Sequence, residues 1–153
     1  MIQLLIDQYE QGGPMFRAAV QGLTREQLTA FPVPGTWSIQ QVVLHLADSD
    51  LVNADRMKRV IAEDNPPLIG FDESRFVREL HYHDQSVEDA LSLFAVNRRQ
   101  MARVLRRLPE SAFARQGTHN QRGPVTLEQL LRGAIGHLEH HLKFLHEKKD
   151  RLG

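Results

Sequence analysis

Apolar residues recur with helical spacing over most of this chain, and this pattern leaves few folds open to it. Four segments each carry a one-sided apolar stripe, and they span residues 2–23, 38–65, 86–108 and 126–145. An amphipathic helix becomes stable mainly when its apolar stripe packs against other elements. Because the alternation typical of strands is almost absent, the pattern predicts an all-α fold, a four-helix bundle.

Short polar motifs mark where helices begin. A Ser or Thr followed three residues later by Gln is a capping box, in which each side chain accepts a hydrogen bond from a free backbone N–H at the helix start. The chain has three such pairs, and the first should open only a short turn of helix: Thr24 with Gln27, Ser38 with Gln41, and Thr126 with Gln129. Ser86 is a further N-cap residue. Within the first segment we expect the proline of Gly12-Gly13-Pro14 to kink or split the helix.

The connection between the second and third helices is unusually long. It runs from Pro66 to about Gln85 and can hold a short helix at residues 72–80, whereas residues 109–125 form a polar loop. A connection of this length usually crosses a bundle or builds a site. We therefore predict a long crossover connection between helices two and three. The chain shows no repeat or linker, so residues 1–153 should form a single domain.

Charge and composition argue against several kinds of partner. The formal net charge is zero, whereas nucleic-acid-binding domains and membrane-surface helices usually have a basic excess. The chain has no cysteine, which excludes disulfides, thiolate metal ligands and a cysteine nucleophile. The first residues lack the basic and apolar regions of a signal peptide, and no segment is apolar for the length of a membrane span. We therefore expect a cytoplasmic protein.

The spacing of histidines near the C-terminus suggests a metal site. His137 and His141 lie four positions apart in a helical segment, so both rings leave the same face about one turn apart. A third ligand must come from elsewhere, and His45 in the second helix is the best candidate. Three neutral imidazoles that leave a fourth position open are typical of a catalytic zinc site. All three residues fall beside the apolar stripes, where two helices can flank a cleft.

Two polar residues lie where the second helix should be buried. Asp50 and Asn53 fall near the centre of its apolar side. An unpartnered polar group in a core costs about 1–3 kcal/mol, so each of them needs a partner. We expect that they orient a metal-binding imidazole through hydrogen bonds.

A simpler interpretation of the histidine pair stays open. Histidines near the C-terminus of a helix are often only polar surface, because they complement the negative end of the helix dipole. The other histidines should be solvated, namely His81, His83, His119, His140 and His146. The arginines of the third helix could bind anions but more often form a solvated face, namely Arg98, Arg99, Arg103, Arg106 and Arg107.

Spacing excludes several other sites. A zincin motif needs glutamate directly after its first histidine, where this chain has Leu138, so Glu139 is misplaced for that role. A ferritin-like di-iron site needs Glu-x-x-His pairs, and no glutamate here has a histidine three residues later. The chain also lacks the Gly-x-Ser-x-Gly nucleophile elbow and a phosphate-binding loop.

Residues 34–49, PGTWSIQQVVLHLADS, resemble the signature of the DinB-like superfamily, in particular its YfiT branch. The resemblance extends over nearly the whole chain through residues 22–28 (GLTREQL), Asn53, Arg56, Lys58, residues 63–67 (EDNPP) and residues 136–141 (GHLEHH). It implies a four-helix bundle, often dimeric, in which His45, His137 and His141 bind a divalent metal, usually zinc or nickel. Members of this family with an assigned activity include S-transferases that use bacillithiol or mycothiol and a related isomerase. Many others are described only as metal-dependent hydrolases.

These features lead to hypotheses of different classes. In the first, the chain is a metal-dependent enzyme whose open position takes water or a substrate thiol, and it acts on a small molecule as a thiol S-transferase or a hydrolase. The absence of cysteine is compatible with a thiol that arrives as a cosubstrate. The enzyme would be a homodimer without nucleic-acid or membrane partners. In the second, a non-catalytic ion joins the second helix to the fourth and the bundle serves a protein partner. The third hypothesis is a bundle that has lost its metal.

Overall fold

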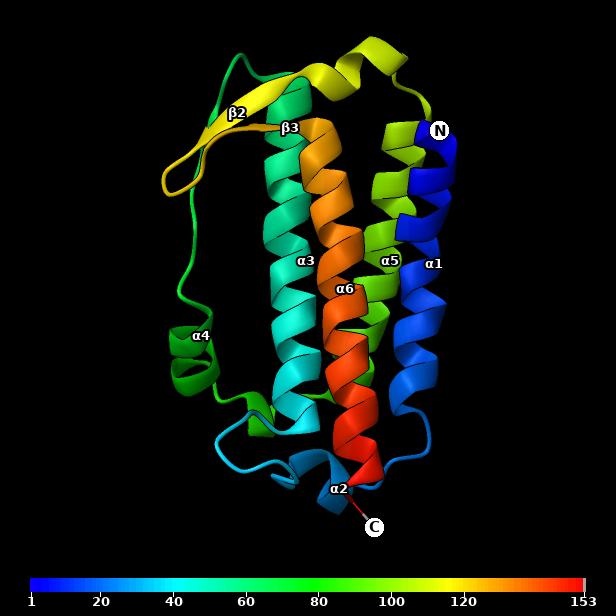
Figure 1. The fold of residues 1–153 in the computed structure, drawn as a ribbon, viewed down its shortest axis with the longest axis vertical. Coiled ribbons are helices and arrows are strands. Elements are labelled where there is room, and N and C mark those ends of the chain that lie inside the picture. The colour runs from blue at the N-terminus through cyan, green and yellow to red at the C-terminus, as the bar shows by residue number, and fades with distance from the viewer. Residues whose placement is uncertain (153) are drawn as a thin grey trace.

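Four long helices form the body of the molecule, which is described over residues 1–152 of a computed structural model (Figure 1). They are α1 (Ile2–Val20), α3 (Ile39–Ala62), α5 (Val87–Arg106) and α6 (Leu127–Asp150). Helix α1 packs against α5 and α6, and α3 packs against the same two helices. This arrangement confirms the predicted four-helix bundle.

The predicted capping motifs are formed. Ser38 Oγ accepts a hydrogen bond from the Gln41 N–H at 3.1 Å, and Gln41 Oε1 accepts one from the Ser38 N–H at 3.0 Å. The same reciprocal pairs begin α6 at Thr126 and the short helix α2 (Arg25–Thr29) at its preceding threonine. The predicted serine cap of α5 is also present. Local side-chain chemistry therefore sets these helix starts.

Helix α1 is not split at Pro14, because it continues through the proline as one helix. Gly12 and Gly13 precede the proline and are buried. A side-chain carbon on Gly12 would lie 2.6 Å from Arg98 Nη1, and one on Gly13 would lie 3.1 Å from Ala95 Cβ. The two glycines therefore let α1 approach α5 closely. This packing holds the helix together although proline removes one of its backbone hydrogen bonds.

The connection after α3 returns along the length of the bundle, so α3 and α5 run in the same direction (Figure 1). It contains strand β1 (Pro67–Leu68), helix α4 (Glu73–Glu79) and the 3-10 helix η1 (Tyr82–Asp84). The Asp72 side chain caps α4 by accepting a hydrogen bond from the Arg75 N–H at 3.0 Å. The structure confirms the predicted crossover and the short helix within it.

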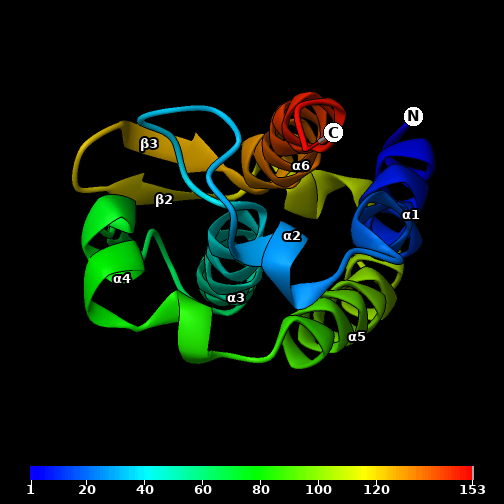
Figure 2. The same cartoon turned by 90° about the horizontal axis from the view of Figure 1, so that it is seen from below.

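A small sheet lies on one flank of the bundle, where the sequence indicates only a polar loop. After α5 follow the 3-10 helix η2 (Glu110–Ala114) and the strands β2 (Gln116–His119) and β3 (Gly123–Thr126). Strand β2 pairs antiparallel with β3 and parallel with β1. Helix α4 and the β2–β3 hairpin lie on the side of α3 that faces away from α1 (Figure 2). The crossover and the hairpin thus cover the same flank.

Two apolar clusters fill the interior of the bundle. One includes Phe16 and Phe94, and the other includes Tyr9 and Met57. Along α3 and α5, the position at which one cluster gives way to the other is occupied by Asp50 and Arg98. None of the helices within residues 1–152 combines the length and the hydropathy that a membrane span requires.

The side chain of Arg98, a residue of α5, contacts the other three long helices. Its Nε donates to Asp50 Oδ1 on α3 at 2.9 Å, its Nη1 to the Tyr9 carbonyl on α1 at 3.0 Å, and its Nη2 to the Ala134 carbonyl on α6 at 3.1 Å. Arg98 is 2% exposed and Asp50 is 4% exposed. The expectation that Arg98 belongs to a solvated face is therefore wrong, because a buried carboxylate on α3 draws it into the core.

Candidate metal centre

Three histidines from two helices come together on one side of the bundle. His45 lies on α3, and His137 and His141 lie on α6. One nitrogen from each ring lies within 4.8 Å of the other two. His45 Nε2 is 3.2 Å from His137 Nε2, although the two residues are 92 positions apart in sequence. The structure thus brings together the three residues that the spacing and the resemblance single out.

The packing of α3 on α6 creates this cluster. The rings of His137 and His141 have centroids 4.7 Å apart, as expected for residues one turn apart on a helix. The His45 ring faces them at centroid distances of 5.1 and 4.9 Å. His45 is only 1% exposed, so it is buried rather than placed at a margin. One reason is the Trp37 indole, just before α3, whose centroid lies 4.9 Å from that of the His45 ring.

The electrostatics of the cluster suit a bound cation. Burial and the neighbouring imidazoles lower the pKa of His45 to about 3. Burial, followed by the charges of nearby histidines, lowers the pKa of His141 to about 4 and also lowers the pKa of His137. All three rings are therefore neutral at pH 7 and have a nitrogen lone pair to offer. Three neutral imidazole nitrogens around one point fit a divalent cation such as zinc.

Metal-free protein should lose stability as the pH falls below about 6.5. Each imidazole of the unfolded chain takes up a proton near the ordinary pKa of 6.5, whereas the folded protein keeps the three rings neutral to lower pH. The unfolded state then binds more protons, so the free energy of unfolding decreases as the pH falls from about 6.5 toward 4. Urea unfolding in a chelator would measure this slope, and His45→Gln should flatten it. Identical slopes in the variant and the wild type would contradict the expectation.

Glu73 of α4 also lies beside the histidine cluster, although it is not among the predicted site residues. Its Oε2 lies 3.4 Å from His45 Nε2, and its side chain is 55% exposed. Ser49 Oγ lies 3.4 Å from the other ring nitrogen of His45, Nδ1. Helix α4 has only seven residues, too few for a periodic signal. The available signal was the length of the connection that carries Glu73.

Asp50 and Asn53 have the partners that their burial demands, but these partners are not imidazoles. Besides its pair with Arg98, Asp50 accepts a hydrogen bond from Asn97 Nδ2 at 2.9 Å, and Asn53 donates to a backbone carbonyl of α6 at 3.4 Å. Burial raises the pKa of the Asp50 carboxyl, and the Arg98 charge acts in the opposite direction. Five residues of helix turn Asp50 about 140° away from His45. The expected hydrogen bonds to an imidazole are therefore not made within residues 1–152.

Most of the remaining histidines are exposed as predicted, but His119 is not. It lies on β2, is 5% exposed, and its Nδ1 accepts hydrogen bonds from the Gln121 and Arg122 N–H groups at 3.1 and 3.3 Å. The prediction fails here because β2 and β3 form a hairpin instead of a loop. His83 is half-buried, with Nε2 at 2.7 Å from Ser38 Oγ. The exposed histidines are His81, His140 and His146.

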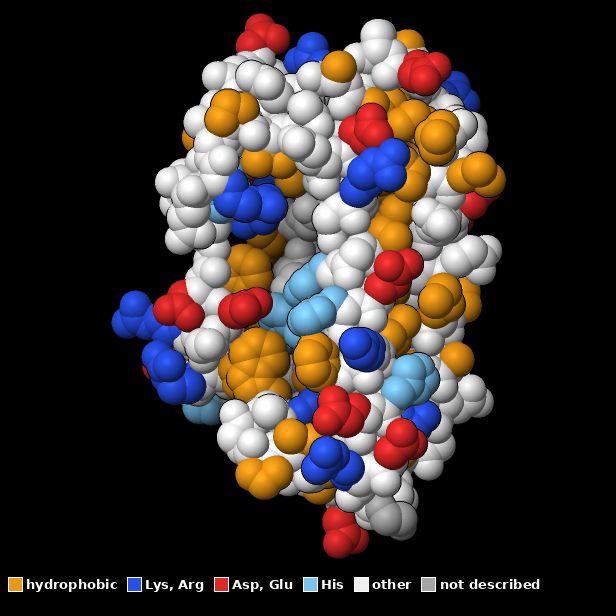
Figure 3. Space-filling view, in the orientation of Figure 1, with side chains coloured by type: hydrophobic (Ala, Val, Ile, Leu, Met, Phe, Trp, Pro, Cys, Tyr) orange, Lys and Arg blue, Asp and Glu red, His pale blue; other side chains and the backbone are white. Residues whose placement is uncertain are grey.

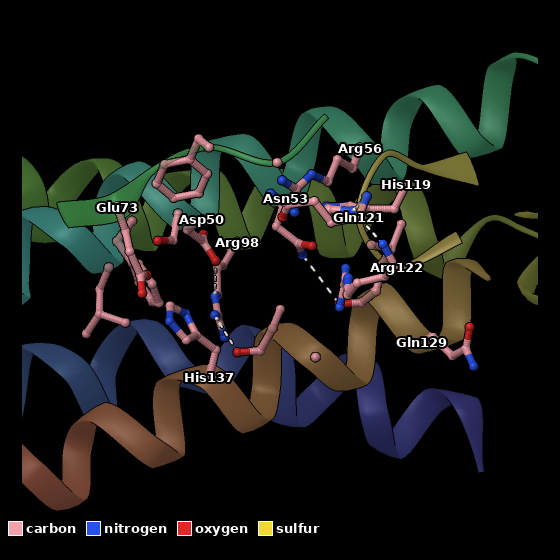
Figure 4. A pocket seen from close by; sticks show the side chains of 18 residues that line it. Asp50, Asn53, Arg56, Glu73, Arg98, His119, Gln121, Arg122, Gln129 and His137 are labelled. Atoms are coloured by element: carbon pink, nitrogen blue, oxygen red, sulfur yellow. Dashed lines mark hydrogen bonds and ion pairs between the residues drawn. The ribbon is translucent and has the colours of Figure 1, made fainter. Parts of the chain in front are cut away.

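Two cavities adjoin the cluster. The first has a volume of about 350 Å³ and lies among α3, α6, the start of α4 and the β2–β3 hairpin, with Glu73 and His137 at one end (Figure 4). The surface is hollowed next to the histidine side chains, with basic side chains on the far rim (Figure 3). The second cavity, of about 400 Å³, is lined by Trp37, His141 and Lys148 among others. The histidines are thus open to small molecules from two sides.

Comparisons with known sequences identify the family. The model of the DinB superfamily matches residues 8–145. A protein of Oceanobacillus iheyensis named "Putative metal-dependent hydrolase" is 29% identical over 137 residues, which cover 90% of this chain and 79% of the relative. YfiT of Bacillus subtilis, which has the same name, is 28% identical over 138 residues, covering 90% of this chain and 78% of the relative.

Solved structures agree with the sequence comparisons. The structure of Bacillus subtilis YfiT, described as an unusual four-helix bundle, matches with a TM-score of 0.93 and 27% identity, covering 99% of this chain and 87% of that one. A mycothiol-dependent maleylpyruvate isomerase matches with a TM-score of 0.75 over 95% of this chain and 60% of that one, but at 12% identity this shows the fold alone. The chain therefore belongs to the DinB superfamily and has the four-helix bundle of its YfiT-like members.

Proposed function

We propose that this chain is an enzyme that uses a divalent metal, zinc or nickel, held by His45, His137 and His141. The convergence of three imidazole nitrogens within 4.8 Å carries this proposal. The metal dependence in the names of its relatives supports it. The cavities beside the histidines are of a size that suits a small-molecule substrate.

The residues around the histidines would have separate roles in catalysis. A divalent cation lowers the pKa of the water or thiol that it binds and so supplies a nucleophile at neutral pH. Burial keeps the imidazoles neutral and able to hold the ion. Glu73 Oε2, at 3.4 Å from His45 Nε2 and open to solvent, is placed to accept the proton of the nucleophile. Trp37 shields one side of His45 from water.

The reaction we propose is the transfer of a small thiol to an electrophile. The chain has no cysteine, so the thiol would be a cosubstrate, and the two cavities lined by His137 and His141 offer separate space for two substrates. The thiol sulfur would bond to the electrophilic carbon, its proton would pass to Glu73, and the leaving group would depart with the electron pair of the broken bond. Hydrolysis of an ester or amide is the second candidate, and the names of the relatives favour it.

A non-catalytic bundle is the competing proposal, in which the ion only joins α3 to α6. Structural zinc sites are usually closed by four protein ligands, whereas catalytic sites keep one position open. Within residues 1–152 the metal-binding group consists of three histidines, and one of them borders a cavity of about 350 Å³. This openness favours an enzyme.

The proposal is tested on protein purified without a metal-affinity tag. We expect about one zinc or nickel ion per chain and metal-dependent turnover in one of two assays. The first assay joins low-molecular-weight thiols to electrophiles, and the second hydrolyses a panel of esters and amides. Thiol conjugation alone would support the transferase, and hydrolysis alone would support the second candidate. Metal-loaded protein that is inactive in both assays would contradict the enzyme proposal and leave the non-catalytic bundle.

A further inference from the structure

The 350 Å³ cavity has a second end, which lies away from the histidines. There Arg56 of α3 faces Arg122 and His119 of the hairpin, whereas Glu73 and His137 lie at the other end (Figure 4). Asp50 and Arg98 also line the cavity, but they pair with each other. The cavity therefore has a basic end that neither the fold nor the proposed metal site explains.

The guanidinium group of Arg56 is only partly satisfied. Its Nη2 donates to the Ile69 carbonyl at 2.7 Å, but its Nε is buried without a hydrogen-bond partner. The adjacent carboxylate, Asp55, pairs with Arg59 instead. Burial and the charge of Arg122 lower the pKa of Arg56. Two like charges thus share one end of a cavity, and no carboxylate within residues 1–152 forms an ion pair with either of them.

His119 adds a third donor at the same end. Because its Nδ1 accepts two backbone hydrogen bonds, the neutral ring carries its proton on Nε2. Burial, followed by the charges of Arg122 and Arg56, lowers its pKa, so the ring is neutral at pH 7. Because His119 lines the cavity, its Nε2–H is available to a ligand.

We propose that Arg56, Arg122 and His119 bind the carboxylate or phosphate group of a small organic anion. Guanidinium groups recognise both oxyanions through paired, charge-assisted hydrogen bonds. A purely structural Arg56, which only holds the backbone at Ile69, would not require Arg122 and His119 beside it.

The position of this anion subsite restricts the substrate. Eleven residues of α3 separate His45 from Arg56, a rise of about 16 Å along the helix. The anionic group of the substrate is therefore several bonds away from the atom that reacts at the histidines. This consequence, unlike the subsite itself, rests on the proposed function.

The test is calorimetric titration of the full-length, metal-loaded protein with two probes, succinate and inorganic phosphate. We expect saturable binding of at least one probe that weakens with added salt. Affinity should fall about tenfold or more in Arg56→Gln and in Arg122→Gln, because each removes a charge-assisted hydrogen bond. Arg103→Gln is the matched control, since Arg103 is an exposed arginine of α5 outside the cavity, and it should bind like the wild type. The preferred probe distinguishes a carboxylate from a phosphate ligand.

His45→Ala separates this proposal from the metal site. If the anion lies on the arginines, the variant should lose its metal and still bind the probe. Loss of probe binding in His45→Ala would place the anion at the histidines and overturn the proposal, as would unchanged affinity in both arginine variants or no saturable binding by the wild type. Arg122 is exposed on the hairpin, so its replacement leaves the fold intact even if Arg56→Gln does not fold. Wild-type protein that holds no metal but binds the probe would contradict the proposed function alone.

Discussion

The His45→Ala and His137→Ala variants should each lose the bound metal and show turnover lowered by more than about 100-fold. Loss even of a group that only supports a metal ligand typically costs 10–100-fold in affinity or activity, and these residues are proposed as the ligands themselves. The two histidines come from different helices, so loss of metal in both variants would show that α3 and α6 contribute to one site. Metal content by elemental analysis and the rate in the responsive assay measure the two effects.

The control for this experiment is His146→Ala. His146 lies on α6 like His137, but it is exposed and outside the cluster. The His146→Ala variant should keep its metal and the wild-type rate of turnover. If the His45 and His137 variants retained one metal per chain, the three-histidine site would be wrong, whatever the activity. Circular dichroism on all three variants would separate loss of the metal from loss of the fold.

Replacing Arg98 by leucine should destabilise the metal-free protein by about 3–5 kcal/mol, because it leaves the Asp50 carboxylate buried without its partner. The change also removes the hydrogen bonds to the Tyr9 and Ala134 carbonyls. Chemical unfolding in a chelator measures the free energy without a contribution from bound metal. This loss would be a large part of the 5–15 kcal/mol that a domain typically has.

A double variant shows whether the unpaired charge is the cause. Asp50→Leu combined with Arg98→Leu should recover much of the lost stability, because an apolar pair of similar size has no charge to desolvate. Arg103→Leu, on the exposed face of the same helix, should change the free energy by no more than about 0.5 kcal/mol. A double variant as unstable as Arg98→Leu would indicate that the backbone carbonyls, rather than Asp50, need the arginine.

The helices were predictable because their signals are local. Ser38 and Gln41 are three residues apart, and their capping box can be recognised without knowing what the helix packs against. The same holds for the spacing of His137 and His141. Predicting His45 required more information, because nothing in the sequence around it shows that it lies beside His137, 92 positions away. There the resemblance to a family supplied what periodicity lacks.

The residues that were missed or misjudged depend on contacts between distant segments. Arg98 has the spacing of a surface arginine, and only Asp50 on another helix accounts for its burial. Gly12 and Gly13 favour a break in α1 until their close approach to α5 is known. Strands of four residues, such as the one that carries His119, are too short for alternation to be distinguished from a loop. Glu73 was hidden for a similar reason, on a helix of two turns.

Trp37 is an intrinsic fluorescent probe of the histidine cluster. It is the only tryptophan of the chain, and its ring lies 4.9 Å from that of His45. All indole fluorescence therefore originates next to the proposed ligands, and a change in their charge or occupancy should alter its intensity. Stopped-flow mixing of unlabelled protein with zinc or nickel would then give the rates at which each ion enters and leaves. Those rates, rather than equilibrium affinity alone, would show which of the two metals the protein retains.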